Sequence, residues 1–274
     1  MAGGDPRLLL VGGGRMGGAL LRGWLEKGIA APDAVTVIEP ADEARAALAA
    51  LGVRALAAPD DILDGRAGFD LVLLALKPQV MDEAGIYAPL GAGGAVFLSI
   101  AAGKTTAYFR ALLGASAAVV RAMPNTPAQV GRGITALFAT AEVDGSGRAL
   151  AGRLMEAVGE VVWLEDEALM DAVTAVSGSG PAYLFYLIEC LAAAARQAGL
   201  ADDLAERLAR ATVTGAGELA HLSTEPAAIL RQQVTSPGGT TAAALEVLMA
   251  EGGLEELMVR AVAAAADRSR ELAG

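Results

Sequence analysis

The length, composition and charge of the chain limit its class. It has 274 residues, 54% of them apolar, and a formal net charge of −11 at pH 7. This length is enough for one large or two ordinary domains. The acidic balance argues against a nucleic-acid partner, because such binding rests on lysine and arginine. Much of the apolar share is alanine, and the longest uncharged apolar stretch, Pro181 to Ile188, is too short for a membrane span, which indicates a helix-rich soluble protein with no membrane partner.

Two further features bear on the compartment. Met1 to Pro6 has no basic region, long apolar core or small-residue cleavage site, so no secretory signal is expected. The single cysteine, Cys190, cannot form an internal disulfide, and in its apolar helical stretch we expect a small core residue. A cytoplasmic location is therefore expected, and no metal site is predicted.

The first part of the chain alternates between strand and helix patterns. Short apolar runs bounded by Gly, Pro and Asp are typical of strands buried on both faces of a mostly parallel sheet. The predicted strands are Leu8–Val11, Val35–Glu39, Leu71–Leu76, Ala95–Ile100, Ala117–Ala122, Ile134–Thr140 and Val161–Leu164. This alternation predicts a Rossmann-type, doubly wound α/β domain over residues 1–165.

From Glu167 onward the strand patterns stop, and an all-helical domain over residues 166–274 is predicted. The expected helices are Glu167–Val176, Pro181–Ala198, Asp202–Leu222, Pro226–Val234, Thr240–Ala250 and Glu255–Leu272, with Gly199 as one helix stop. The helical domain is rich in alanine and leucine and poor in aromatic residues, which favours helix packing across a two-fold axis. We expect a homodimer or a higher oligomer built of dimers, with the interface in residues 167–274.

A glycine-rich turn joins the first predicted strand to the first helix. Gly12, Gly14 and Gly17 fit the Gly-x-Gly-x-x-Gly fingerprint. The first glycine allows a tight turn, the second lets the backbone approach a pyrophosphate, and the third lets helix and strand pack closely. The helix N-terminus adds free N–H donors and a partial positive charge. This context predicts a dinucleotide site rather than a merely structural turn.

Glu39, at the end of the second predicted strand, bears on which dinucleotide binds. A carboxylate there accepts hydrogen bonds from both adenosine ribose hydroxyls of NAD and repels the extra phosphate of NADP. No arginine follows immediately, and Arg45 is the nearest candidate partner for a phosphate. The pattern therefore favours NADH over NADPH, against the alternative that Glu39 is a solvated loop residue.

Five further motifs carry a family resemblance. They are Ala75-Leu76-Lys77-Pro78-Gln79, Ser99-Ile100-Ala101-Ala102-Gly103, Met123-Pro124-Asn125-Thr126-Pro127, Val176-Ser177-Gly178-Ser179-Gly180-Pro181-Ala182-Tyr183 and Val234-Thr235-Ser236-Pro237-Gly238-Gly239-Thr240-Thr241. In this order, and spanning most of the chain, they resemble the pyrroline-5-carboxylate reductases, which reduce a cyclic imine to proline. The last two motifs together are highly specific.

The resemblance implies a Rossmann-type domain, a helical domain that pairs across a dimer and completes the substrate site, and NAD(P)H as cofactor. It assigns to the dinucleotide Gly12, Gly13, Gly14, Arg15, Met16, Gly17, Ala75, Leu76, Lys77, Pro78, Ile100, Ala101, Ala102 and Asn125, the last of these near the nicotinamide. It assigns to the substrate, 1-pyrroline-5-carboxylate, residues Ser236, Gly239, Thr240 and Thr241, with Glu167 and Gln233 close by.

The implied reaction moves a hydride from the nicotinamide to the imine carbon. Backbone N–H groups of the run from Ser236 to Thr241 can hold the substrate carboxylate, and its glycines allow close approach. Thr241, with Ser236 beside it, is the expected catalytic group, because its hydroxyl can orient the ring nitrogen. The alternative is a Ser/Thr cluster that only caps a helix. The sole histidine, His221, lies outside every motif and is expected to be a surface or cap residue.

Two departures from the family pattern are visible. The family commonly carries small polar and basic residues after the second strand, where this chain has Glu39-Pro40-Ala41. Arg15 occupies a position that is often asparagine in the family, and the sequence assigns it no specific task.

Two rival functions remain at this stage. A related imine or β-hydroxyacid oxidoreductase of the same architecture would need an acid/base lysine in the helical domain, and no lysine follows Lys104. Lys77, at a predicted strand end, suits cofactor contact instead. A non-catalytic dinucleotide-binding regulator would leave the run from Ser236 to Thr241 unexplained.

Overall fold

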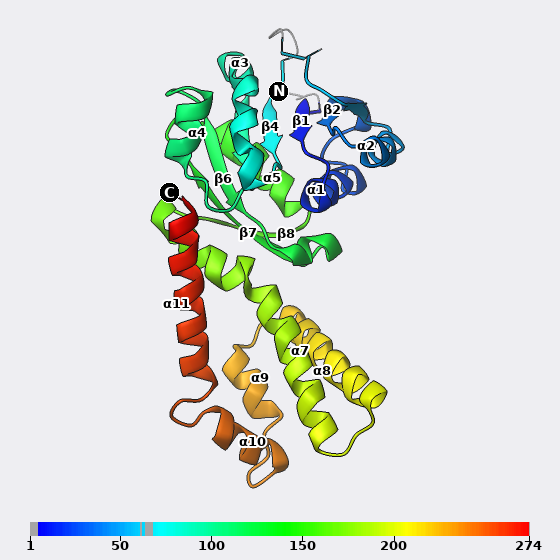
Figure 1. Ribbon diagram of the computed structural model, residues 1–274, viewed down its shortest axis with the longest axis vertical. Helices are drawn as coiled ribbons and strands as arrows, with labels where there is room; N and C mark the ends of the chain where they lie inside the picture. The colour runs from blue at the N-terminus through cyan, green and yellow to red at the C-terminus, as the bar shows by residue number, and fades with distance from the viewer. Residues whose placement is uncertain (1–4, 61, 64–67, 274) are drawn as a thin grey trace. The chain divides into compact units, whose positions relative to one another are not determined.

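The computed structural model describes residues 5–60, 62–63 and 68–273 (Figure 1). Of the N-terminal segment searched for a secretory signal, Met1–Gly4 lie outside the described residues. The chain divides into two compact units. The first comprises Met1–Gly178 and Ala266–Gly274, and the second comprises Ser179–Ala265.

The first unit contains one sheet whose described strands run in the order β3-β2-β1-β4-β5-β6-β7-β8. All neighbouring strands are parallel except β6 and β7, which pair antiparallel. The strands are β1 (Leu8–Val11), β2 (Val35–Ile38), β3 (Arg54–Leu56), β4 (Leu71–Leu74), β5 (Val96–Ser99), β6 (Val119–Met123), β7 (Gly133–Ala139) and β8 (Gly159–Trp163). The predicted Rossmann-type doubly wound sheet is confirmed, and its order reverses between β1 and β4.

Helices and helical turns cover both faces of this sheet. They are α1 (Arg15–Glu26), η1 (Pro32–Ala34), α2 (Asp42–Ala49), η2 (Pro78–Tyr87), α3 (Ala88–Ala92), α4 (Thr106–Leu113), η3 (Thr126–Val130), α5 (Gly145–Glu156), η4 (Glu167–Leu169), α6 (Met170–Val173) and the π-helical turn η5 (Thr174–Gly178). Alternate residues of each strand point to opposite faces, so Leu8 and Leu10 join one core cluster while Leu9 and Val11 join the other. The first cluster includes Trp24 of α1, and the second includes Phe109 of α4.

Two elements of this unit differ from the sequence expectation. β3 was not expected, because it has three residues, contains the exposed Arg54 and lacks an apolar run. The helix expected over Glu167–Val176 is instead a succession of 3-10, α and π turns. The Thr174 hydroxyl donates to the Met170 carbonyl at 2.8 Å, a backbone contact of the kind that bends helices.

The second unit is helical, as predicted. Its helices are α7 (Gly180–Gln197), α8 (Asp202–Leu222), α9 (Ala227–Gln233), α10 (Thr240–Leu248) and α11 (Leu254–Ala273), of which the end of α11 belongs to the first unit. Figure 1 shows α7 and α8 as an antiparallel pair. Gly199 lies between them with a φ of 95°, so it accepts the left-handed conformation expected at a helix stop.

Little apolar surface is buried in the second unit. Within the described residues 179–265, the buried side chains are those of Ala192, Ala205 and Ala209, whereas Phe185 is 62% exposed and Leu219 is 68% exposed. Such a large exposed apolar surface marks an interaction site.

The burial expected of Cys190 is contradicted, because this residue is exposed on α7. An apolar helix is buried only when other elements pack against each of its apolar faces. Within a single chain, other elements cover α7 only in part.

The two compact units divide after Gly178, whereas the composition changes near residue 165. The segment between these points, which includes η4, α6 and η5, therefore belongs by its contacts to the first unit. Among the described residues, no helix has both the length and the apolar composition needed to cross a membrane.

Candidate active site

The glycine turn between β1 and α1 is shaped by close backbone packing. Gly12 has a φ of 98°, and a Cβ placed on it would lie 2.7 Å from the Ala75 carbonyl oxygen. A Cβ on Gly17 would lie 2.2 Å from the Gly12 carbonyl oxygen. Both positions therefore require glycine, because any side chain would force the turn, α1 and β4 apart.

Gly14 differs from these two glycines. A Cβ there would have no neighbouring heavy atom within 4 Å, and both Gly14 and Arg15 are exposed. Gly14 is the N-cap of α1, where no side chain accepts a hydrogen bond and no acidic residue occupies the first turn. The open space and uncapped N–H groups fit a pyrophosphate, which binds at such helix ends.

Glu39 follows β2 and lies against the glycine turn. Its Oε2 accepts a hydrogen bond from the Gly13 N–H at 2.9 Å, and its Oε1 accepts one from the Ala41 N–H at 2.9 Å. These two bonds hold the carboxylate at the corner where the β1 and β2 loops meet. A carboxylate oxygen accepts more than one hydrogen bond, so both oxygens keep acceptor capacity for ribose hydroxyls.

Arg45 shares this corner. Its guanidinium donates to the carbonyl oxygens of Glu39 at 3.1 Å and Pro40 at 3.0 Å and pairs with Asp42. Its positive charge is therefore close to Glu39, but its donors are directed to backbone carbonyls and to Asp42.

Two further loops meet the glycine turn at the same carboxyl edge of the sheet. Ala75, after β4, donates its N–H to the Val11 carbonyl at 2.8 Å. Ile100, after β5, donates its N–H to the Leu74 carbonyl at 3.3 Å. The loops after β1, β4 and β5 are therefore neighbours, and the stretches 75–78 and 100–102 line one edge beside the switch point, where ligands of doubly wound sheets bind. Lys77 is exposed there.

Asn125 joins two motifs that lie far apart in the sequence. Its Nδ2 donates to the Ser177 carbonyl at 3.2 Å, and its Oδ1 accepts from the Ile134 N–H at 3.0 Å. A Cβ on Gly178 would lie 2.4 Å from Cε of Met123. The motif around Asn125 therefore packs directly on the turn that contains Ser177 and Gly178.

Glu167 takes part in a cluster that sequence reasoning did not foresee. Its Oε1 accepts from the Thr106 N–H at 2.7 Å and from Nη1 of Arg121 at 3.0 Å, and its Oε2 accepts from the Thr106 hydroxyl. The Arg121 side chain is 6% exposed. A lone arginine in an apolar strand run was the available signal, because a buried guanidinium needs an acidic partner.

The run from Ser236 to Thr241 opens α10 in the second unit. Gly238 has a φ of 67°, and a Cβ on Gly239 would lie 2.3 Å from Oγ of Ser236, so both positions favour glycine. Gly239 is the N-cap, with no side-chain cap and no acidic residue in the first turn. The Ser and Thr hydroxyls therefore do not cap α10, and its first N–H groups are oriented for an anion.

Two other predicted residues lie in the same unit. Gln233, the last residue of α9, is exposed. His221 is exposed in the last turn of α8, as expected of a surface residue.

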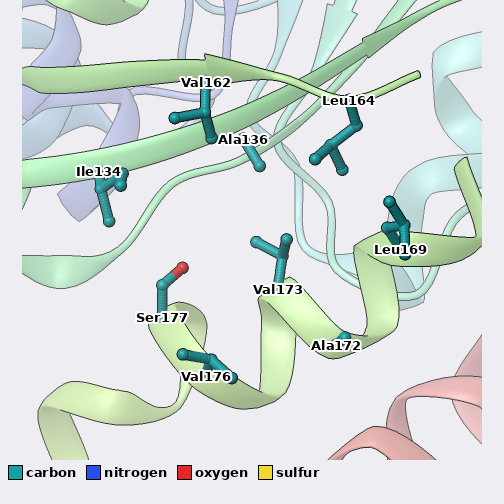
Figure 2. A pocket seen from close by; sticks show the side chains of 9 residues that line it. All are labelled: Ile134, Ala136, Val162, Leu164, Leu169, Ala172, Val173, Val176 and Ser177. Atoms are coloured by element: carbon teal, nitrogen blue, oxygen red, sulfur yellow. The ribbon is translucent and has the colours of Figure 1, made fainter. Parts of the chain in front are cut away.

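An apolar pocket of about 390 Å³ lies between the β7–β8 face and the segment that follows β8 (Figure 2). Figure 2 shows strand side chains facing those of the helical turns, with the Ser177 hydroxyl as the polar group among them. The lining residues are Ile134, Ala136, Val162, Leu164, Leu169, Ala172, Val173, Val176 and Ser177. This lining offers no charge partner for a dinucleotide or a carboxylate.

The sheet, its switch point and the open glycine turn together define a protein of the dinucleotide-binding Rossmann class. Residues 7–103 match the family described as NADP oxidoreductase, coenzyme F420-dependent. Residues 167–272 match the family described as pyrroline-5-carboxylate reductase dimerisation.

Similarity to known proteins extends over nearly the whole chain. The chain is 41% identical to the pyrroline-5-carboxylate reductase of Pseudomonas aeruginosa, over 98% of this chain and 97% of that one. A solved pyrroline-5-carboxylate reductase from Coxiella burnetii is 35% identical, with a TM-score of 0.91 and coverage of 99% and 100%. The Plasmodium falciparum pyrroline carboxylate reductase, solved with NADP bound, is 25% identical, with a TM-score of 0.81 and coverage of 98% and 99%. The chain belongs to the pyrroline-5-carboxylate reductase family, whose members are oxidoreductases.

Proposed function

We propose that this protein reduces 1-pyrroline-5-carboxylate to L-proline with NAD(P)H, the final step of proline biosynthesis. Family membership over nearly the full chain supports the reaction. The observation that carries the proposal for this chain is the N-terminus of α10, where two glycines and two threonines lie at an uncapped helix end of the kind that suits an anion. That feature suits the substrate carboxylate and is more than a helix cap requires.

The proposed cofactor site lies in the first unit. The open space at Gly14 and the uncapped end of α1 support pyrophosphate binding there. The remaining proposed contacts are Gly12, Gly13, Arg15, Met16, Gly17, Glu39, Ala75, Leu76, Lys77, Pro78, Ile100, Ala101, Ala102 and Asn125. When bound, NAD(P)H supplies the hydride.

The proposed substrate site centres on α10. Backbone N–H groups at Gly239, Thr240 and Thr241 bind the carboxylate, and the Ser236 hydroxyl adds a donor. The Thr241 hydroxyl orients the ring nitrogen, so that the imine carbon accepts the hydride while the nitrogen keeps or gains one proton. Glu167 and Gln233 are proposed to lie close to this site.

NADH is proposed as the preferred cofactor. The support is the Glu39 carboxylate, held by the Gly13 and Ala41 N–H groups beside the glycine turn. A negative charge there repels a ribose phosphate, and the donors of Arg45 are already directed to carbonyl oxygens and Asp42.

The protein is proposed to form at least a dimer through residues 167–274. The described part of the second unit buries only alanine side chains and exposes large apolar ones, of which Phe185 is an example. A second copy would cover this surface, and the matched dimerisation family spans residues 167–272.

One assay tests the proposed reaction against its rivals. The purified protein is incubated with NADH and 1-pyrroline-5-carboxylate, and absorbance of the reduced cofactor is followed, with proline measured as product. We expect loss of reduced cofactor matched by proline. Two results would contradict the proposal. One is oxidation of a β-hydroxy acid with NAD(P)⁺ in place of imine reduction, and the other is binding of the dinucleotide without any turnover.

A further inference from the structure

Arg121 is the one charged residue among the buried residues that the structure describes. It lies on β6, where a guanidinium loses its water and must be compensated by a nearby acid. Glu167 provides that acid, with Nη1 of Arg121 and Oε1 of Glu167 3.0 Å apart. Glu167 follows β8, at the start of the segment that matches the dimerisation family.

The same carboxylate also holds the beginning of α4. Thr106 is the first residue of α4, and its N–H and its hydroxyl both donate to Glu167. The first N–H groups of a helix have no partner within the helix and carry partial positive charge, so an acid there is favourable. Thr105, the N-cap, satisfies a different donor, the N–H of Tyr108 at 3.2 Å.

The loop that precedes Thr106 is held on a second side as well. Gly103 has a φ of 75°, and a Cβ on it would lie 3.3 Å from both Cβ and the carbonyl oxygen of Leu272 on α11. The buried Ser269 hydroxyl of α11 donates to Oδ1 of Asp171 at 2.6 Å. The loop over residues 100–105 therefore lies against two segments of the dimerisation region, one at Glu167 and one at the end of α11.

We infer that Glu167 is a positioning residue for the cofactor. Through Thr106 it fixes the conformation of the loop over residues 100–105, and this loop sets the affinity for the nicotinamide dinucleotide. The inference rests on the proposed assignment of Ile100, Ala101 and Ala102 to the cofactor site. It gives Glu167 a task separate from its proposed place near the imine substrate, because its carboxylate accepts hydrogen bonds from Thr106 and Arg121.

The test compares Thr106→Val with Thr106→Ser as its matched control. Valine removes the hydroxyl donated to Glu167 but keeps the N–H, whereas serine keeps both. The dissociation constants for NADH and NADPH are measured by calorimetry on the full-length protein without substrate. Thr106→Val should weaken the binding of both by about 10- to 100-fold, the scale of a hydrogen bond to a charged group, and Thr106→Ser should stay within about 2-fold of wild type. The turnover number at saturating cofactor should be nearly unchanged.

Two results would overturn the inference. One is unchanged dinucleotide affinity with a raised KM for the imine, which would make Glu167 a substrate-binding group. The other is unchanged dinucleotide affinity with only a lower Tm, which would make the cluster purely structural. If Thr106→Val does not fold, Thr106→Ala, which also removes the hydroxyl and keeps the N–H, replaces it and should weaken dinucleotide binding to a similar extent. Failure of the wild type itself to bind NADH or NADPH would refute the proposed function instead, so the two failures are distinguishable.

Discussion

Thr241 lies in the first turn of a helix that no side chain caps. A threonine hydroxyl near a helix N-terminus commonly serves as a cap, and the absence of that bond in α10 leaves the hydroxyl free of that structural task. This makes a ligand-binding role testable by single substitutions.

Thr241→Ala is expected to lower turnover by about 10- to 1000-fold, because it removes one preorganised donor worth roughly 1.4–4 kcal/mol in the transition state. The dissociation constant for the cofactor should be nearly unchanged. Steady-state kinetics with the imine and calorimetry with NADH measure the two quantities.

Thr241→Ser is the matched control, since it keeps the hydroxyl, and it should retain most of the turnover. His221→Ala should be nearly silent, because His221 is exposed at the end of α8. If Thr241→Ala turns over like the wild type, the hydroxyl has no catalytic role.

Glu39 sets the second prediction at this scale. The wild type should show a higher kcat/KM with NADH than with NADPH, and Glu39→Ser should narrow or reverse that ratio. The change should be chiefly in KM, because the contact is remote from the chemistry and nearly equal in the ground and transition states. Both cofactors are measured at saturating imine on both proteins.

Glu39→Gln removes the negative charge of this side chain while nearly keeping its shape. Its amide oxygen can still accept from the Gly13 N–H, whereas its NH2 group cannot accept from the Ala41 N–H. Because the negative charge is gone, this variant should improve the use of NADPH. A wild type that clearly prefers NADPH would show that Glu39 does not act on the ribose phosphate. Arg45 would then be the group to test as its partner.

At the scale of elements, the glycine turn provides a paired prediction. Gly14→Ala should leave the free energy of unfolding within about 1 kcal/mol of wild type, since it exchanges one N-cap residue for another in open space. It should nevertheless weaken dinucleotide binding, because the added methyl group occupies the space left for the pyrophosphate. Chemical denaturation and calorimetry measure the two effects.

Gly17→Ala should lower both the free energy of unfolding and the affinity for the dinucleotide. Its Cβ would lie 2.2 Å from a backbone oxygen, so α1 must move, and overpacking of this kind costs about 1–3 kcal/mol. Equal dinucleotide affinity in wild type and Gly14→Ala would show that the pyrophosphate does not bind at this helix end.

Local sequence patterns predicted most of the helices and strands, and each exception has a physical cause. The strands of the sheet interior are apolar on both faces, so a short run such as Leu8–Val11 is enough to identify them. The edge strand β3 lacks that signal, because its three residues are exposed or only half-buried. The π turn at Thr174–Gly178 is set by packing against Met123 and by the bond between Asn125 and Ser177, which sequence periodicity does not report.

At the scale of the whole molecule, the exposed apolar side chains of the second unit predict that the protein forms a homo-oligomer. At micromolar concentration, light scattering should give at least a dimer, because exposed apolar side chains such as Phe185 need a partner surface. Phe185→Glu should reduce the oligomer and lower Tm, since it would place a charge in the proposed interface.

Val130→Glu is the control for this experiment. Val130 is 75% exposed in η3 of the first unit, outside residues 167–274, so the substitution should leave both the mass and Tm unchanged. If the wild type is a fully active monomer, or if Phe185→Glu keeps the wild-type oligomeric state, the proposed interface does not lie on this surface.

The sequence by itself determined the fold class, the glycine turn after the first strand and the family. Each depends on residues that act close together along the chain: short apolar runs, glycines at fixed spacing, and motifs such as the one from Ser236 to Thr241. The tertiary structure alone decided that Glu167 pairs with Arg121 and Thr106, residues 46 and 61 positions away in the sequence. Such pairs form because the sheet brings β6 and the start of α4 beside the segment that follows β8, and no local pattern records that proximity. The same reason explains Cys190, whose burial depends on what covers α7 and not on its apolar neighbours in sequence.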